Sequence, residues 1–186
     1  MSQRTSAVPV LILLTCLVAV LASPASAQER YTYSLGLLAG VGGSVDAKPG
    51  DDLSNLTYQF NGALVTEPRT LLGLRVGQVD FRQADPLGTL SNAKLNYATI
   101  AGEYRYSQSF YESGVYLGLG GYQLKGDSLL SGKSDSESAF GLTLGLTGEF
   151  EVTRHLSILI ELSGHWANLD EEQIFALGHV GLTFHD

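Results

Sequence analysis

The chain has 186 residues, a formal net charge of −8 at pH 7 and a single cysteine, Cys16. An acidic chain without a basic patch is a poor partner for nucleic acid, so we expect no nucleic-acid binding. One cysteine excludes a disulfide within the chain, and its position near the amino terminus leaves the remaining residues without thiol chemistry. We expect no cofactor and no metal site.

The first 27 residues have the composition of a secretory signal peptide. An arginine supplies the positive charge, residues 7–22 form the apolar segment, and the last three residues read Ala-Ser-Ala, a small-residue cleavage site. We therefore predict cleavage between Ala27 and Gln28. A transmembrane anchor is the alternative, but the apolar segment is shorter than the ~20 residues that a spanning helix needs. A lipid anchor on Cys16 is disfavoured because the apolar run continues past that residue.

Residues 28–186 alternate in polarity with a period of two, which is typical of β-strands because successive side chains point to opposite faces of a sheet. Eight such segments follow one another: residues 31–41, 55–64, 72–77, 94–106, 114–120, 140–150, 156–166 and 174–184. The pattern is clearest in residues 140–150 and 156–166, where one face is mostly large and apolar and the other is mainly Gly, Thr, Ser and Glu. The segments and their connections use all of residues 28–186, which predicts a single domain.

The connections between these segments also follow a pattern. Those after the first, third, fifth and seventh segments are mostly long, polar and acidic, and those after the second, fourth and sixth are short. We expect the longest connection at residues 123–138. Around residues 78–81 the alternation slips by one, which we interpret as a bulge or the end of the strand. An even number of antiparallel strands with long connections at one end is typical of bacterial outer-membrane barrels.

The composition of the less apolar face distinguishes a lipid environment from water. A soluble eight-stranded barrel would turn its oily face inward around a ligand and expose this second face. The second face consists mainly of Gly, Thr and Ser with few charges, which suits the inside of a narrow barrel better than a water-exposed surface. We therefore predict an all-β, eight-stranded, antiparallel up-and-down transmembrane β-barrel, with a soluble barrel as the alternative.

Aromatic side chains gather near the ends of the segments, where a membrane barrel has its two interfacial girdles. We expect one girdle at the periplasmic rim and the other at the outer rim. The predicted girdle residues are Tyr31, Tyr33, Tyr104, Tyr106, Phe150 and Phe184 at the first rim, and Tyr58, Tyr97, Tyr122, Phe140 and Trp166 at the second.

Charged residues of the second face are expected inside the barrel. They are Arg75, Glu103, Arg105, Glu149 and Glu161, with His165 and His179 as further members. An eight-stranded barrel has room for little more than its own side chains, so we predict a structural network of ion pairs and hydrogen bonds in the lumen. A narrow gated pore for ions or small solutes is the alternative.

The signal peptide, the eight alternating segments and a last strand that ends Val-Gly-Leu-Thr-Phe at Phe184 resemble the small outer-membrane barrel proteins. This group includes the OmpA amino-terminal barrel, OmpX and the opacity-type surface proteins. The resemblance implies a place in the outer membrane among its lipids and lipopolysaccharide. It also implies that the outer-membrane assembly machinery recognises the terminal aromatic Phe184, which His185 and Asp186 follow here.

One pair of residues bears on catalysis, because lipid A deacylases and palmitoyltransferases are also eight-stranded barrels. Ser163 lies two residues before His165, so a base lies near a hydroxyl. The deacylase motif has its serine two residues after the histidine, where this chain has Ala167. We predict no enzymatic activity. We expect a structural role, or binding of an extracellular ligand, through acidic loops; residues 170–172 lack the spacing of a calcium-binding loop.

Overall fold

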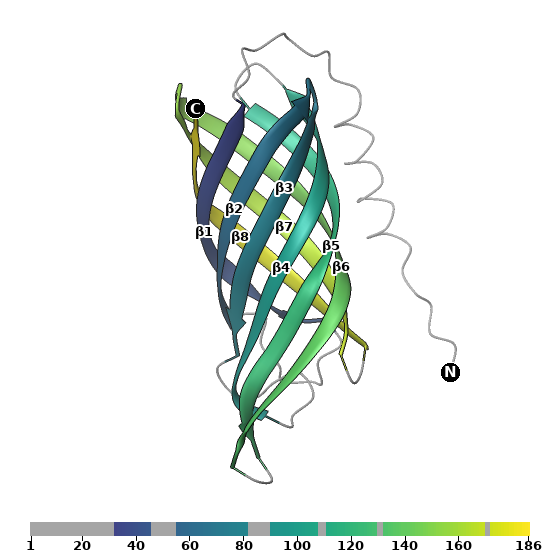
Figure 1. Cartoon of the computed structure of the whole chain (residues 1–186). Helices are drawn as coiled ribbons and strands as arrows, with labels where there is room; N and C mark the ends of the chain where they lie inside the picture. Colours follow the sequence, from purple (N-terminus) through teal and green to yellow (C-terminus); the bar gives the residue numbers. More distant parts are fainter. Residues whose placement is uncertain (1–31, 46–54, 82–89, 108–110, 130–131, 170–171) are drawn as a thin grey trace, which may run out of the picture.

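The structure of the chain, a computed structural model, describes residues 32–45, 55–81, 90–107, 111–129, 132–169 and 172–186 (Figure 1). The strands are β1 Tyr33–Ser44, β2 Asn55–Glu67, β3 Thr70–Asp80, β4 Leu90–Ser107, β5 Tyr111–Ser128, β6 Ser134–Thr153, β7 Leu156–Asn168 and β8 Glu172–His185. The predicted signal peptide and Tyr31 lie outside the described residues. No helix in the described ranges is both long enough and apolar enough to cross a membrane.

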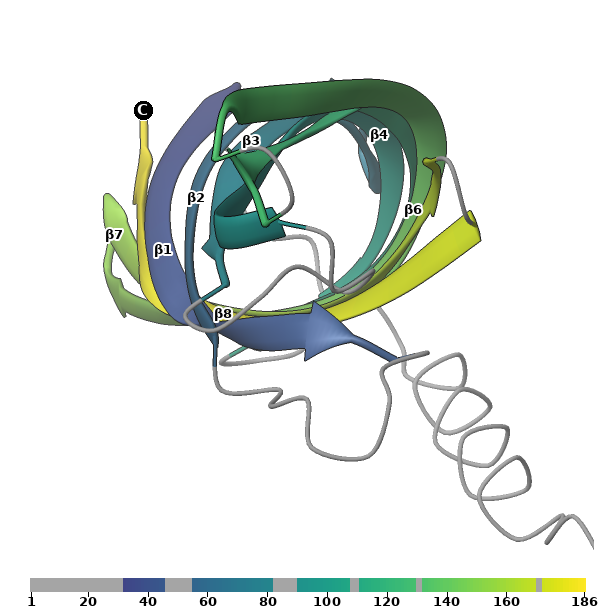
Figure 2. The same cartoon turned by 90° about the horizontal axis from the view of Figure 1, so that it is seen from below.

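The strands form a closed antiparallel barrel in sequence order, in which β1 pairs with β8 (Figure 2). The predicted eight-stranded up-and-down fold is confirmed. Following the Cα partners once around the barrel from Ser34 leads back to β1 at Ser44, a stagger of ten residues (44 minus 34). This stagger tilts the strands against the barrel axis, and a barrel of eight strands leaves space for side chains alone.

The two ends of the barrel differ (Figure 1). The turn end holds the C-terminus and the ends of β2, β4 and β6, and the loop end holds the ends of β1, β3, β5 and β7. At the loop end β4, β5 and β6 extend beyond the other strands. The prediction of a long connection at residues 123–138 was wrong, because β5 runs to Ser128 and β6 begins at Ser134.

Outward-facing side chains form an apolar band around the barrel. Burial alternates along the strands, and large apolar residues occupy the exposed positions: Leu37 is 71% exposed, Leu117 63% and Leu162 60%. Contiguous exposed apolar surface of this kind is rare in proteins surrounded by water, whereas it is the expected outer surface of a barrel in hydrocarbon. The oily face therefore points outward, as the sequence predicts.

The apolar band ends abruptly on β3 to β6. One outward row across β2 to β6 reads Phe60, Val76, Ala98, Gly121 and Phe140. The next row toward the loop end reads Tyr58, Gln78, Asn96, Gln123 and Ser138, and the row after it reads Leu56, Asp80, Lys94, Lys125 and Ser136. On β3 to β6 the outward face thus changes from apolar to polar within one row.

Near the loop end the inward face changes in the opposite sense. Buried apolar side chains form one cluster, the apolar cap, made of Val79, Phe81, Leu90, Ala93, Leu95, Tyr97, Tyr122, Leu124, Ala167, Leu169, Phe175 and Leu177. The slip in alternation at residues 78–81 is therefore not a bulge. β3 stays in register with both neighbouring strands as far as its end at Asp80, and the slip marks the exchange of polarity between the two faces.

Most predicted girdle residues lie on the outer surface, but two do not. Among the described residues, Tyr33, Tyr58, Tyr104, Phe140, Phe150 and Phe184 are exposed, and Tyr106 and Trp166 are half-buried. The placement of Tyr97 and Tyr122 in the outer girdle was wrong, because each is 2% exposed and belongs to the apolar cap. Tyr97 shares the inward face of Thr99, and Tyr122 that of Tyr116, so the period of two already assigns both to the lumen.

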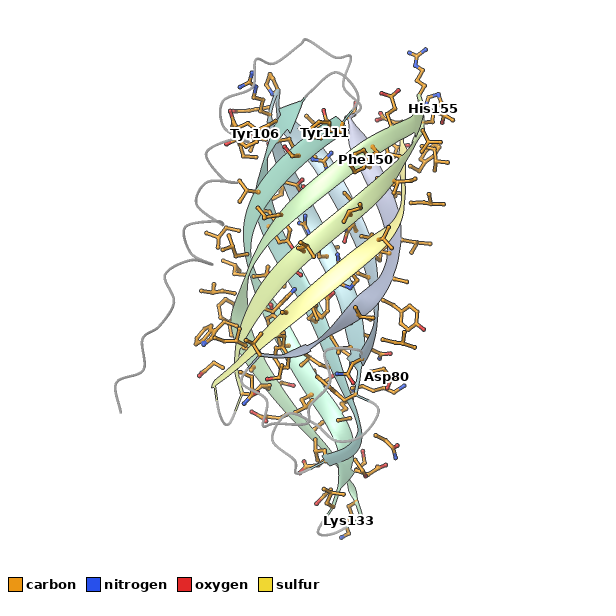
Figure 3. All side chains as sticks on the ribbon, turned by 180° about the vertical axis from the view of Figure 1, so that it is seen from behind. Asp80, Tyr106, Tyr111, Lys133, Phe150 and His155 are labelled. Carbon is orange, nitrogen blue, oxygen red and sulfur yellow. The ribbon has the colours of Figure 1, made fainter. Side chains whose placement is uncertain are left out.

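The turn end has an aromatic contact at the start of β5, in residues that lie between the predicted segments 94–106 and 114–120. Tyr111, the first residue of β5, stacks on Phe150 with ring centroids 5.9 Å apart (Figure 3). Tyr104 and Tyr106 lie edge to face near the same end, with centroids 4.9 Å apart. Aromatic rings at this height are the expected interfacial contacts of a membrane barrel.

Candidate functional site

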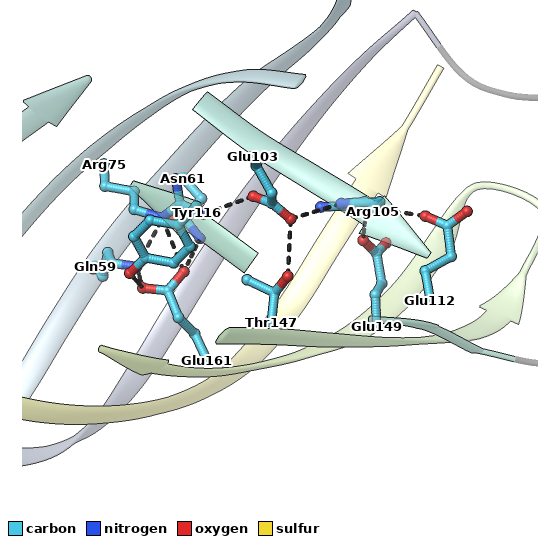
Figure 4. A network of polar contacts seen from close by, with 10 residues as sticks. All are labelled: Gln59, Asn61, Arg75, Glu103, Arg105, Glu112, Tyr116, Thr147, Glu149 and Glu161. Atoms are coloured by element: carbon cyan, nitrogen blue, oxygen red, sulfur yellow. Dashed lines mark hydrogen bonds and ion pairs between the residues drawn. The ribbon is translucent and has the colours of Figure 1, made fainter. Parts of the chain in front are cut away.

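The centre of the lumen holds Arg75 of β3 and Glu161 of β7 (Figure 4). Arg75 Nε lies 3.0 Å from Glu161 Oε2, and its Nη2 lies 2.8 Å from Glu103 Oε2. The guanidinium carbon lies 3.6 Å from the centroid of the Tyr116 ring. Glu161 also accepts hydrogen bonds from Tyr116 OH at 3.0 Å and from Gln59 Nε2 at 2.8 Å. Each central charge is thus paired and hydrogen-bonded, as a buried charge requires.

Arg105 forms a second layer nearer the turn end. Its Nε lies 2.7 Å from Glu103 Oε1, and its Nη1 contacts Glu149 at 2.5 Å and Glu112 at 3.3 Å. The other carboxylate oxygen of Glu149 lies 2.5 Å from His185 Nε2. Because Glu103 is bound by both arginines, the network runs unbroken from the lumen centre toward the turn end (Figure 4).

The seven predicted lumen residues all point inward, but the structure does not join all of them. The linked members are Arg75, Glu103, Arg105, Glu149 and Glu161. His165 is outside this series of ion pairs and lies 2.9 Å from Tyr122 OH and 3.0 Å from Ser163 Oγ. His179 is 3% exposed, and neither of its ring nitrogens has a hydrogen-bond partner within the described part of the chain.

Sequence reasoning missed several members of the network. They are Gln59, Asn61, Glu112, Thr147, Ser157 and His185. The period of two places two titratable members of this group inside the barrel. His185 lies on the same inward face as Thr183, and Glu112 lies on the same inward face as Gly114. The remainder are uncharged, and nothing in the sequence separates them from other polar residues on the inward face.

Glycines on the inward face make room for these large side chains. A Cβ at Gly145 would lie 2.4 Å from the ring of Tyr116, and a Cβ at Gly77 would lie 2.4 Å from the ring of Tyr97. An outward glycine is different, since a Cβ at Gly102 would meet nothing within 4 Å. The narrow lumen therefore holds tyrosines where the facing position on the next strand has no side chain.

Ser163 and His165 are hydrogen-bonded to each other inside the barrel. Ser163 is 7% exposed and His165 1%. The imidazole lies against two tyrosine rings of the apolar cap, with centroids 4.9 Å away for Tyr97 and 5.9 Å for Tyr122. The pair thus faces the lumen rather than the outer surface on which a lipid substrate would lie. The described residues include no group of three His, Cys, Asp or Glu side chains that could hold a metal ion.

Asp186, the residue after β8, links β8 to the start of β1 at the turn end. Asp186 Oδ1 accepts hydrogen bonds from the backbone N–H of Thr32 at 2.6 Å and of Tyr33 at 3.1 Å. Phe184 points outward, 50% exposed, and stacks on His155 with ring centroids 6.2 Å apart. Its recognition by the assembly machinery stays a prediction.

The contact between Asp186 and the start of β1 predicts a pH dependence that Asp186→Ala removes. The N–H of Tyr33, together with that of Thr32, holds the pKa of the Asp186 carboxyl below its usual range. A carboxyl with a lower pKa in the folded state stabilises the fold above its ordinary pKa of about 4, and this contribution is lost as the pH falls below that value. Urea midpoints, followed by the fluorescence of Trp166, should therefore fall more steeply below about pH 4 in the wild type than in Asp186→Ala. Parallel profiles would contradict this role.

A closed barrel of eight staggered antiparallel strands, an apolar outer band and a lumen filled by side chains define the class of small transmembrane β-barrels. The crystal structure of neisserial surface protein A is similar, with a TM-score of 0.65, 12% identity and coverage of 83% of this chain and 96% of that one. The N-terminal barrel domain of Pseudomonas aeruginosa OprF has a TM-score of 0.55 and 12% identity, over 84% of this chain and 100% of that one. Ail, the attachment invasion locus protein of Yersinia pestis, has a TM-score of 0.50 and 16% identity, over 82% and 96%.

These similarities are similarities of fold. No family model and no curated protein matches the chain. The resemblance to small eight-stranded outer-membrane barrels, which the sequence pattern predicts, is confirmed by the structural neighbours.

Proposed function

We propose that the chain is an integral outer-membrane protein with a closed lumen and no catalytic activity, whose loop end is an interaction surface outside the cell. One observation carries the proposal: the outward face turns from apolar to polar near the loop end, where the inward face becomes apolar. An apolar outer band is stable in contact with lipid, whereas a polar outer face over an apolar interior is stable in contact with water. The loop end therefore projects from the membrane.

The interaction role rests on the shape of the loop end. β4, β5 and β6 carry a sheet beyond the apolar band, and β1 and β3 end at the same end of the barrel (Figure 1). Barrels of this class have short turns in the periplasm and longer loops outside, which gives the loop end its extracellular orientation. Loops held by a rigid scaffold are the usual place for binding.

The contacts of the lumen favour a closed barrel over a gated pore. The ion-pair network fills the lumen from its centre toward the turn end, and the apolar cap fills it at the loop end. Two barriers of different chemistry thus lie in series. A substitution that breaks the ion pair between Arg75 and Glu161, such as Glu161→Leu, would leave the apolar cap in place. We therefore expect the Glu161→Leu barrel not to conduct ions in planar bilayers.

The membrane location predicts opposite outcomes for two arginine substitutions. Leu162→Arg is expected to lower the free energy of unfolding by about 2–4 kcal/mol, because Leu162 is 60% exposed and lies midway along β7 in the apolar band. Gln123→Arg lies in the first polar row and should change it by less than about 1 kcal/mol. Urea unfolding in phosphatidylcholine vesicles measures both. In a water-soluble barrel neither residue would meet lipid, so equal midpoints would overturn the membrane assignment.

The orientation is tested with an epitope inserted at each end of the barrel. An epitope after Gly132, between β5 and β6, is expected to bind antibody on intact cells. An epitope after Pro68, between β2 and β3, should bind only after the outer membrane has been permeabilised. Heat-modifiable gel mobility shows that each tagged barrel has folded. The reverse pattern of labelling would contradict the proposed interaction surface.

A further inference from the structure

Five buried polar atoms in the middle of the lumen have no hydrogen-bond partner among the described residues. They are Thr57 Oγ1, Thr99 Oγ1, Thr143 Oγ1 and both ring nitrogens of His179. The four residues are between 0% and 3% exposed. Buried polar groups are nearly always hydrogen-bonded, and an unsatisfied one costs about 1–3 kcal/mol. So many unpartnered atoms in one part of a closed barrel indicate a ligand.

Two of these residues share one wall of the barrel. Gly40 of β1 pairs with His179 of β8 on one side and with Thr57 of β2 on the other. Because Gly40 has no side chain, none separates the imidazole of His179 from the hydroxyl of Thr57. Both polar groups face the lumen, and neither has a hydrogen-bond partner among the described residues.

The other two residues lie on the opposite wall at the same height. Thr99 pairs with Gly120 of β5, and Thr143 pairs with Gly118 of the same strand. β5 is four strands from β1 in a ring of eight, so the two walls face each other. Half of the ten-residue stagger accumulates over those four strands, which brings Gly118 and Gly120 to the height of Gly40.

Filled layers bound this level on both sides. Toward the turn end lie Arg75 and Glu161, with the ring of Tyr116 against the guanidinium. Toward the loop end lie Tyr97 and Tyr122 of the apolar cap, whose rings stack with centroids 6.2 Å apart. The unpartnered atoms thus lie between two packed layers.

We propose that this level is a closed chamber holding ordered water molecules, bound by Thr57, Thr99, Thr143 and His179. Each threonine hydroxyl both donates and accepts a hydrogen bond, and a neutral imidazole has one nitrogen of each kind. Water satisfies both needs, and buried water usually makes about three such bonds. An anion would leave the acceptors unsatisfied, and a metal ion would need ligands that the described residues do not group there. The chamber is independent of what the loop end binds.

The test is NMR of the folded barrel in lipid nanodiscs, with water itself as the probe. Cross-peaks between water and the methyl groups of Thr57, Thr99 and Thr143 are expected. The methyl group of Ala167, which is 0% exposed within the apolar cap, is the dry control and should give none. If the spectrum shows a folded barrel but lacks the threonine cross-peaks, the proposal of bound water is wrong, and the membrane assignment is unaffected.

A second measurement uses the sign of a stability change. The double variant Thr99→Val, Thr143→Val removes two hydroxyls and keeps the shape of the side chains. If water binds the hydroxyls, the variant loses those hydrogen bonds, and its urea midpoint falls together with the remaining water cross-peaks. If the hydroxyls are dry and unsatisfied, their removal relieves a penalty and the midpoint rises. A raised midpoint would overturn the proposal.

Discussion

Replacing Glu161 by leucine is expected to lower the free energy of unfolding by about 3–5 kcal/mol, because it removes one of two carboxylates that pair with the buried Arg75. The same substitution removes the acceptor of Tyr116 OH and of Gln59 Nε2. Urea unfolding in phosphatidylcholine vesicles, followed by the fluorescence of Trp166, the only tryptophan of the chain, measures the loss.

A second substitution separates the effect of the missing negative charge from the effect of the lost packing. Adding Arg75→Met to Glu161→Leu should recover part of the stability, since replacing a whole buried ion pair by apolar side chains is often close to neutral. A double variant that is no more stable than Glu161→Leu would contradict the importance of the charge. Asp80→Ala is the control, because its ion pair with Lys94 spans 3.9 Å between exposed side chains and contributes about 0–1 kcal/mol.

Gly145→Val is expected to prevent the barrel from reaching its folded form. The new Cβ would lie 2.4 Å from the ring of Tyr116, which cannot move away without losing its bond to Glu161 and its contact with Arg75. Overpacking alone costs about 1–3 kcal/mol, and the loss of the central contacts adds to it. Heat-modifiable gel mobility after refolding into vesicles measures the folded fraction.

The matched control is Gly102→Val, the same substitution on the outward face. A Cβ at Gly102 meets nothing within 4 Å, and valine suits both a strand and a lipid-facing surface. This variant should fold as well as the wild type. If Gly145→Val folds as well as Gly102→Val, then the inward glycines do not make room for lumen side chains.

The strands and their faces could be predicted because the period of two depends only on local chain geometry. The inward positions of Arg75, Glu103 and Glu161 follow directly from it. Their partners do not, because the acceptor that Arg75 meets across the lumen depends on the stagger between strands. That stagger arises when the barrel closes and is not contained in the sequence of any one strand.

The same rule fails at the loop end, where the surroundings of both faces change. Val79 and Leu124 are apolar yet point inward. If apolar residues are expected to face lipid, these two positions break the alternation, and the predicted strands therefore end too early. Tyr97 and Tyr122 were assigned by their distance from the strand ends and not by their face. For both tyrosines the period of two was the better guide.

The apolar cap also has a consequence for the order in which the contacts of the barrel form. The ring centroids of Phe81 and Phe175 lie 6.2 Å apart, although the four strands β4 to β7 separate these residues along the chain. Contacts between such distant segments form late, because a long stretch of chain must first be closed into a loop. The cap draws its residues from β3, β4, β5, β7 and β8 and the residues beside them, so it can pack only once β8 has reached the strands that precede it. Packing of the cap therefore marks a late stage of barrel assembly.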